Sequence, residues 1–141
     1  MNKLRLEIVT PETPVLEKDV DFVALPAYEG ELGVLPGHIP LVVQLKEGLL
    51  HYRLGKEREE FAVLGGFAEI SGKKVSVFAE SAALASQINE EEALQAARKA
   101  KAVISSGGAE TEIEAARIAL MRALAFSRLA RRVGKLRGQA R

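Results

Sequence analysis

Residues 60–78, EFAVLGGFAEISGKKVSVF, contain three short apolar runs separated by breaks that contain glycine. The runs are Glu60–Leu64, Phe67–Ile70 and Val75–Phe78. Runs this short, bounded by turn residues, are typical of β-strands, and Ser71-Gly72 predicts a tight turn between the last two. The stretch therefore predicts consecutive antiparallel strands.

The same pattern continues on the N-terminal side. Apolar residues alternate from Leu4 to Ile8, the period of two that a half-buried strand requires. By the same rule Val20, Phe22 and Ala24 are expected to share one buried face. Further short runs are Leu41–Leu45 and Leu49–Leu54. Many short strands with turn signals between them favour an antiparallel β-sandwich or barrel.

The composition changes sharply after residue 87. All five prolines precede residue 41, and the chain beyond residue 87 is rich in alanine. This change predicts a fold of the α+β class with two domains: a β-sandwich in residues 1–87 and an antiparallel two-helix hairpin in residues 88–141.

Capping signals mark the ends of the two expected helices. Asn89 can accept a hydrogen bond from a free backbone N–H, and Glu92 completes a capping box. Residues 105–108, Ser-Ser-Gly-Gly, end the first helix, and Thr111 with Glu114 predicts the cap of the second.

The apolar stripes of this hairpin consist mainly of alanine. The first stripe is Ala93, Ala97, Ala100 and Ile104, and the second is Ile113, Ala116, Leu120 and Ala123. Small side chains allow close helix packing but bury little surface, so the hairpin is expected to depend on docking and to have more than one docked position.

The charges are divided between the two segments. Residues 1–87 carry 13 acidic and 9 basic side chains, whereas residues 88–141 carry 6 acidic and 11 basic ones. Eight basic residues and no acidic residue lie in residues 117–141. A basic helix can bind nucleic acid, anionic lipid or an acidic protein surface, or can simply be solvated. Nucleic acid is disfavoured because Phe126 is the only aromatic residue there.

Motifs for catalysis or metal binding are missing from the sequence. There is no cysteine, and His38 and His51 belong to no metal-ligand pattern, so they are expected to be surface or packing residues. Gly72-Lys73 is followed by Lys74 instead of the serine or threonine of a phosphate loop, which favours a hairpin turn. We expect no catalytic residue, no metal and no cofactor. No membrane-spanning run and no leader is apparent, so we expect a cytoplasmic chain that reaches a membrane only through partners.

Residues 29–41, EGELGVLPGHIPL, resemble the GELGxxPGHxPL signature of the epsilon subunit of F-type ATP synthases. Residues 64–70, LGGFAEI, residues 75–80, VSVFAE, and residues 6–12, LEIVTPE, resemble further blocks of that family. The resemblance covers the whole chain, since the family also has a β-sandwich followed by a two-helix hairpin.

The resemblance implies a non-catalytic part of the central stalk of a bacterial F-type ATP synthase. The sandwich would bind the gamma subunit and the c-ring and couple proton-driven rotation to ATP synthesis, at the cytoplasmic face of the inner membrane. The residues implied at this interface are Glu31, Gly33, Pro36, Gly37, His38 and Pro40.

The resemblance also implies a regulatory role for the hairpin. When extended, it would reach the alpha and beta subunits and restrain ATP hydrolysis, with an acidic segment of beta meeting four basic residues: Arg122, Arg128, Arg131 and Arg132. Some family members bind ATP through a motif like (Ile/Leu)-Asp-x-x-Arg-Ala. The matching residues are Ile88, Asn89, Glu92 and Ala93. Because Asn89 and Glu92 replace the aspartate and the arginine, we expect ATP binding to be absent or very weak.

Overall fold

The structure of the chain is a computed structural model that describes residues 2–139, with side chains described up to Lys135 in the last helix. It separates into two compact units, Met1–Ser86 and Gln87–Arg141. In the described residues the first unit contains the strands β1 (Leu4–Val9), β2 (Pro14–Val20), β3 (Phe22–Ala27), β4 (Gly30–Val34), β5 (Leu41–Gln44), β6 (Gly48–Leu54), β7 (Glu57–Val63), β8 (Gly66–Ile70), β9 (Lys74–Ala79) and β10 (Ala82–Leu84).

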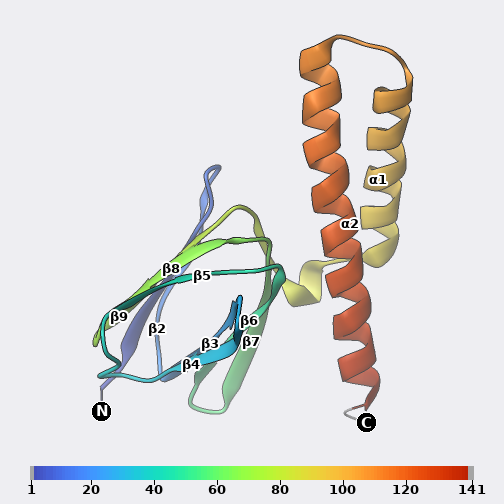
Figure 1. Cartoon of the computed structure of the whole chain (residues 1–141). Coiled ribbons are helices and arrows are strands. Elements are labelled where there is room, and N and C mark those ends of the chain that lie inside the picture. Colours follow the sequence, from blue (N-terminus) through green and yellow to red (C-terminus); the bar gives the residue numbers. More distant parts are fainter. Residues whose placement is uncertain (1, 140–141) are drawn as a thin grey trace. The chain divides into compact units, whose positions relative to one another are not determined.

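The ten strands form two five-stranded sheets that lie face to face (Figure 1). The strand order is β2-β1-β9-β8-β5 in the first sheet and β10-β7-β6-β3-β4 in the second. Neighbouring strands are antiparallel except for β1 and β9, which are parallel. The predicted fold class, a β-sandwich followed by two helices, is confirmed.

The core lies between the sheets and consists of aliphatic side chains from both. Alternate residues of β1 point inward, as predicted from the alternation between Leu4 and Ile8. Val75 and Val77 of β9 join them from the same sheet. The second sheet contributes Val23, Leu25, Leu50 and Val63, all fully buried. Burying one such side chain stabilises the fold by roughly 1.5–3 kcal/mol.

The prediction for residues 20–24 was wrong, because the chain crosses from one sheet to the other at Asp21. Val20 ends β2 in the first sheet, and Phe22 begins β3 in the second. The crossing resets the alternation, so Val23 enters the core while Phe22 lies outside it. The sequence prediction also omitted β2, β4 and β10 as strands.

The crossing is held by hydrogen bonds to Asp21. Its backbone N–H donates to the Arg53 carbonyl oxygen at 2.8 Å, and its Oδ2 accepts from the Gly55 N–H at 2.7 Å. Lys3 forms an ion pair with the same carboxylate. The Gly55 hydrogen bond, and secondarily Lys3, lower the pKa of Asp21. The carboxylate is thus favoured in its charged form at the junction of the sheets.

The Gly65-Gly66 pair connects β7 to β8 at a point of very close backbone approach. Gly66 has φ +104°, and a Cβ atom there would lie 2.0 Å from the Phe78 carbonyl oxygen. No side chain fits at that distance, so β8 can pair with β9 in this register only with glycine at the start of the strand.

The second unit is a hairpin of α1 (Glu90–Ser105) and α2 (Glu110–Gln139), preceded by the short 3-10 turn η1 (Ala85–Gln87) (Figure 1). The predicted cap at Asn89 is confirmed, since its Oδ1 accepts from the Glu92 N–H at 3.2 Å. The predicted cap at Thr111 was wrong: α2 begins at Glu110, so Thr111 lies inside the helix. Gly107, at φ +71°, reverses the direction of the chain early enough for α2 to begin at Glu110.

The contact between α1 and α2 is lined by small side chains. Ala97 and Ala100 of α1 are buried, as are Ala116 and Ala123 of α2. Ile104, Ile113 and Leu120 of the predicted stripes are only half-buried. Alanine buries much less apolar area than leucine or isoleucine, so the hairpin is held more weakly than the sandwich.

We predict that Gly66→Ala destabilises the sandwich by about 3 kcal/mol, because the new methyl group must displace the β9 backbone. Gly55→Ala is the matched control: Gly55 also has a positive φ, +59°, but open space surrounds its Cβ position. The control should cost about 1 kcal/mol. Urea unfolding measures both, and equal losses would contradict the proposed close approach.

Candidate docking surface

The signature segment 29–41 forms one continuous side of the sandwich. It contains β4, which is an edge strand of the second sheet, and a loop that crosses to β5, an edge strand of the first. Backbone hydrogen bonds join the two sheets nearby: the Tyr28 N–H donates to the Gln44 carbonyl oxygen at 3.3 Å, and the Lys46 N–H donates to that of Pro26 at 3.0 Å. These hydrogen bonds hold the segment where the edges of the two sheets meet.

The turn residues of this segment shape and hold the loop. Gly37 has φ +89°, and its N–H donates to the Gly72 carbonyl oxygen at 2.8 Å, which ties the loop to the β8–β9 turn. Pro36 is half-buried and Pro40 is exposed. His38 is half-buried, with Nδ1 2.7 Å from the Ile39 carbonyl oxygen.

Two further predicted residues lie on β4. Glu31 is exposed and pairs in register with Pro26, and Gly33 pairs with Ala24. A Cβ atom at Gly33 would lie 3.1 Å from the Phe22 ring, so the glycine leaves room for that ring. The structure therefore brings all six predicted residues to one side of the sandwich, on β4 and the following loop.

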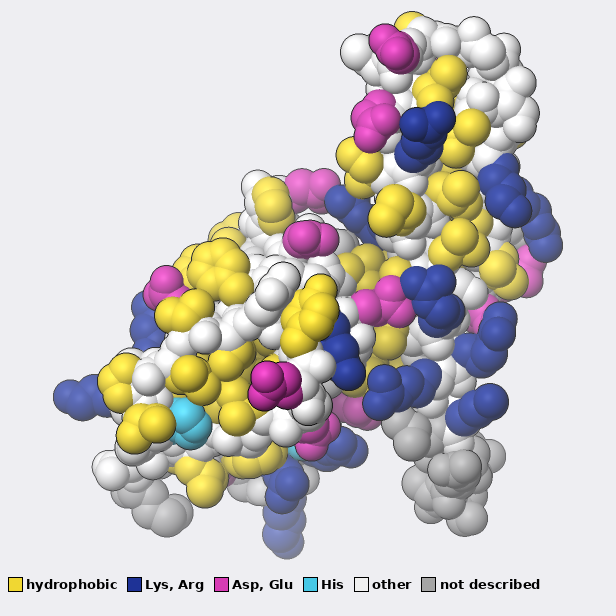
Figure 2. Space-filling view, viewed as in Figure 1, with side chains coloured by type: hydrophobic (Ala, Val, Ile, Leu, Met, Phe, Trp, Pro, Cys, Tyr) yellow, Lys and Arg dark blue, Asp and Glu magenta, His cyan; other side chains and the backbone are white. Residues whose placement is uncertain are grey.

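Large apolar side chains are exposed along the same side. Leu35 and Ile39 of the loop are 61% and 72% exposed, and Val42 of β5 is 66% exposed. Figure 2 shows hydrophobic side chains left uncovered over much of the sandwich on the side seen there. Exposed apolar residues grouped in this way are typical of a protein-binding surface.

An aromatic pair extends this apolar surface over the outer face of the first sheet. Phe67 of β8 and Phe78 of β9 pair in register and stack with ring centroids 5.0 Å apart, and both remain more than one-third exposed. Both residues lie in the predicted apolar runs, but their outward direction was not predicted. The alternation along residues 67–70 contains the signal, since Ala68 and Ile70 are buried and Phe67, on the opposite face, is exposed.

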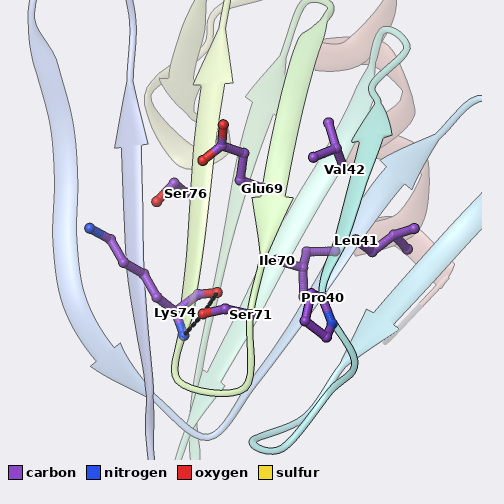
Figure 3. A pocket seen from close by; sticks show the side chains of 8 residues that line it. All are labelled: Pro40, Leu41, Val42, Glu69, Ile70, Ser71, Lys74 and Ser76. Carbon is purple, nitrogen blue, oxygen red and sulfur yellow. Dashed lines mark hydrogen bonds between the residues drawn. The ribbon is translucent and has the colours of Figure 1, made fainter.

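An open depression of about 270 Å³ lies on the first sheet near β5 (Figure 3). Its lining residues are Pro40, Leu41, Val42, Glu69, Ile70, Ser71, Lys74 and Ser76. Val42 and Glu69 come from directly paired positions of β5 and β8. The Lys74 ammonium points toward β1, where it lies 3.2 Å from Glu7 Oε1. The depression thus combines an apolar wall with the Glu69 carboxylate.

His51 lies on the outward-facing side of β6 in the second sheet. Only 8% of the residue is exposed, and its Nε2 has no hydrogen-bond partner among the described residues. Its ring centroid is 5.8 Å from that of Phe22. Burial is the largest cause that lowers the pKa of His51, and Arg58 acts in the same direction. His51 is thus packed among neighbouring side chains, one of the two roles that the sequence predicted for the histidines.

The hairpin arginines differ in their surroundings. Arg131 of α2 forms an ion pair with Glu90 of α1, with Nη2 and Nε 3.0 and 3.1 Å from Oε1. Arg128 and Arg132 are exposed, and Arg122 is half-buried. The basic stretch predicted for residues 117–141 also contains Arg137 and Arg141. The side chain of Arg137 and the whole of Arg141 lie outside the described residues.

The ATP-motif positions lie at the start of α1. Ile88 and Asn89 precede the helix, and Asn89 is engaged as its cap. Glu92 is exposed and Ala93 is half-buried. Nothing in this arrangement tests ATP binding, and its absence remains a prediction. Within residues 2–139 no cluster of three potential metal-ligand side chains occurs. None of the helices described there combines the length and hydrophobicity required to span a bilayer.

The sandwich defines the class of protein. Residues 3–85 match the β-sandwich domain of the delta/epsilon chain of ATP synthase. The chain is 42% identical over 120 residues to the ATP synthase epsilon chain of Desulforamulus reducens, a match that covers 85% of this chain and 91% of the other. It is 43% identical over 126 residues to that of Nitratidesulfovibrio vulgaris strain DP4, covering 89% and 94% of the two chains.

The chain therefore belongs to the ATP synthase epsilon chain family and is a non-catalytic subunit of that complex. Its structure is similar to a chain of the Euglena gracilis mitochondrial ATP synthase, solved as an OSCP/F1/c-ring assembly, with a TM-score of 0.62 and 27% identity over 85% of this chain and 76% of that one. A chain of the Tetrahymena thermophila central stalk and c-ring structure shares the fold, with a TM-score of 0.54 and 14% identity over 92% and 99% of the two chains.

We predict that the stability of the protein falls as the pH drops below about 6.5, the ordinary pKa of histidine. Because the pKa of His51 is lowered in the fold, the unfolded chain binds its proton more readily, and the stabilisation present above that pH is lost as the pH falls. His51→Gln should flatten this part of the profile, measured by urea unfolding between pH 5 and 8.

His38→Gln is the control, because it removes the other histidine of the chain and leaves His51 in place. The same pH slope in the wild type and in the His51→Gln variant would contradict the prediction.

Proposed function

We propose that this epsilon chain couples rotation of the c-ring to the gamma subunit through two adjoining surfaces of its sandwich, and that its hairpin restrains ATP hydrolysis. The observation that carries the proposal is that the edge segment 31–40 and the outer face of the first sheet both expose large apolar side chains. A subunit with two neighbours requires two such surfaces on one stiff body.

The surface for the c-ring is the side made by β4 and the loop that follows it. Glu31 offers an exposed carboxylate for hydrogen bonds with the polar loops of the ring, and Leu35 and Ile39 offer apolar contacts. The hydrogen bond between Gly37 and Gly72 holds the loop in one conformation before it binds. A preformed loop loses little conformational entropy on docking.

The surface for the gamma subunit is the outer face of the first sheet. Phe67 and Phe78 form a stacked aromatic pair, and exposed aromatic residues are frequent anchors of protein interfaces. Val42 and the nearby depression give room for an apolar side chain of the partner. Glu69 at the same depression favours a partner that also presents a basic side chain.

The hairpin supplies the regulatory part of the proposal. Because α1 buries only alanine, separating the two helices costs little free energy, and the exposed Arg132 carries a charge that attracts an acidic partner. We place the contact on the beta subunit, with the alpha subunit beside it. The chain would then lie at the cytoplasmic face of the inner membrane, held there by the complex alone. Nucleotide sensing and nucleic-acid binding have no specific observation in their favour.

We predict that Glu31→Arg and Phe67→Ser affect different partners. Labelled full-length chain is titrated into F1 that lacks this subunit, and into the complete F1–c-ring assembly that lacks it. Glu31→Arg should bind F1 normally but bind the complete assembly about tenfold more weakly. Phe67→Ser should weaken binding to both by about 30-fold, because an aromatic anchor is lost.

Glu112→Arg is the charge control. Glu112 is exposed and lies on α2 of the second unit, so it belongs to neither of the two proposed sandwich surfaces. Normal affinities should be kept by this variant. If Glu31→Arg bound the complete assembly as the wild type does, the ring surface would be misassigned, and unchanged binding of Phe67→Ser to F1 would exclude the gamma surface.

We predict that replacing Arg122, Arg128, Arg131 and Arg132 by alanine raises ATP hydrolysis of the assembled enzyme about threefold at low salt, because the attraction to beta is lost. Steady-state ATPase assays of reconstituted enzyme measure this change. The difference should shrink as salt is raised. Hydrolysis equal to that of wild type at low salt would count against an inhibitory hairpin.

A further inference from the structure

The ion pair between Glu90 and Arg131 connects the first turn of α1 to the C-terminal part of α2. The two residues are 41 positions apart, and both nitrogens of the guanidinium that approach Glu90 contact the same Oε1, at 3.0 and 3.1 Å. The pair lies at the N-terminal end of α1. The C-terminal end of α1 leads into the turn at Gly107, and there the chain itself joins the two helices. The pair therefore acts at the end of α1 where no covalent link holds the helices together.

The packing near this pair is uneven: Leu129 and Val133 of α2, which flank Arg131 in the sequence, are buried, whereas α1 buries only small side chains. The buried residues of α1 are Ala97 and Ala100, and no larger side chain of that helix is buried in the described structure. Because α1 buries only alanine, one charge-assisted pair is a larger share of what holds that helix than it would be for a helix that buries leucine. Loss of the pair is expected to free the N-terminal end of α1.

Arg131 also belongs to the basic group for which we propose contact with the beta subunit. A guanidinium held by Glu90 has fewer donors and less net charge to offer to another acidic surface. The intramolecular carboxylate and the partner's carboxylates must compete for the same cation. This argument rests on the proposed inhibitory function of the hairpin.

We propose that Glu90 acts as an intramolecular competitor: it pairs with Arg131 in the closed hairpin and so opposes both separation of the helices and the inhibitory contact. The pair is largely exposed, with side-chain exposures of 59% for Arg131 and 39% for Glu90. Exposed pairs of this kind shift an equilibrium by about two- to fivefold at low ionic strength. This magnitude suits a regulatory bias, because it leaves both states accessible.

The experiment compares Glu90→Gln with Glu91→Gln, the matched control that removes one negative charge from the same helical turn. The chain has no cysteine, so the substitutions Gln95→Cys and Met121→Cys, the latter at an exposed position, provide two selective sites for spin labels. In the full-length chain at low salt, Glu90→Gln should raise the population with separated helices about threefold. Glu91→Gln should resemble the wild type, and the exchanged pair Glu90→Arg with Arg131→Glu should restore the closed distance.

A second measurement separates this inference from the proposed function. In the reconstituted enzyme, Glu90→Gln should lower ATP hydrolysis about threefold, the opposite of the four-arginine variant. If the label distances shift but hydrolysis does not, the pair holds the hairpin closed and the inhibitory role is wrong. If Glu90→Gln gives the same distances as Glu91→Gln, the competitor role of Glu90 is overturned, whatever the ATPase assay shows.

Discussion

The apolar contact between the two sheets is the interaction on which the rest of the structure depends. Fully buried aliphatic residues such as Leu6, Val77 and Leu50 meet across it, and they fix the position of every strand. Only a rigid core allows the edge strands β4 and β5 to hold their connecting loop at a defined corner. The same rigidity suits the sandwich to the coupling role that we propose for it, because a stiff body transmits torque without absorbing it in local motion.

The hairpin, in contrast to the sandwich, lacks a large aliphatic core between its helices in the part of the chain that the structure describes. The buried side chains of α1 are alanine, and Glu90 in its acidic first turn pairs with Arg131 in the basic stretch of α2. Contacts made by exposed charges respond to salt and to competing partners, whereas a buried aliphatic core does not. One chain thus combines a stiff sandwich with an adjustable hairpin, which suits the coupling and regulatory roles that we propose.

Local rules predicted what local interactions decide. The alternation from Leu4 to Ile8 and the cap at Asn89 follow from neighbouring residues, and both were foreseen. Failures arose where distant segments decide the outcome. Asp21 ends one strand because Gly55 and Lys3 approach it, and the outward direction of Phe67 depends on which face the second sheet covers. The Glu90–Arg131 pair spans 41 positions, and no periodicity in the sequence indicates it.

Native-state hydrogen exchange of the full-length chain tests the central claim, a rigid sandwich joined to a weakly held hairpin, most directly. The account predicts that amides of β6 and β9 exchange only through global unfolding, with the free energy that urea unfolding gives. Amides in the first half of α1 should exchange through a separate opening of much lower free energy. Protection of those α1 amides equal to that of β9 would contradict the account.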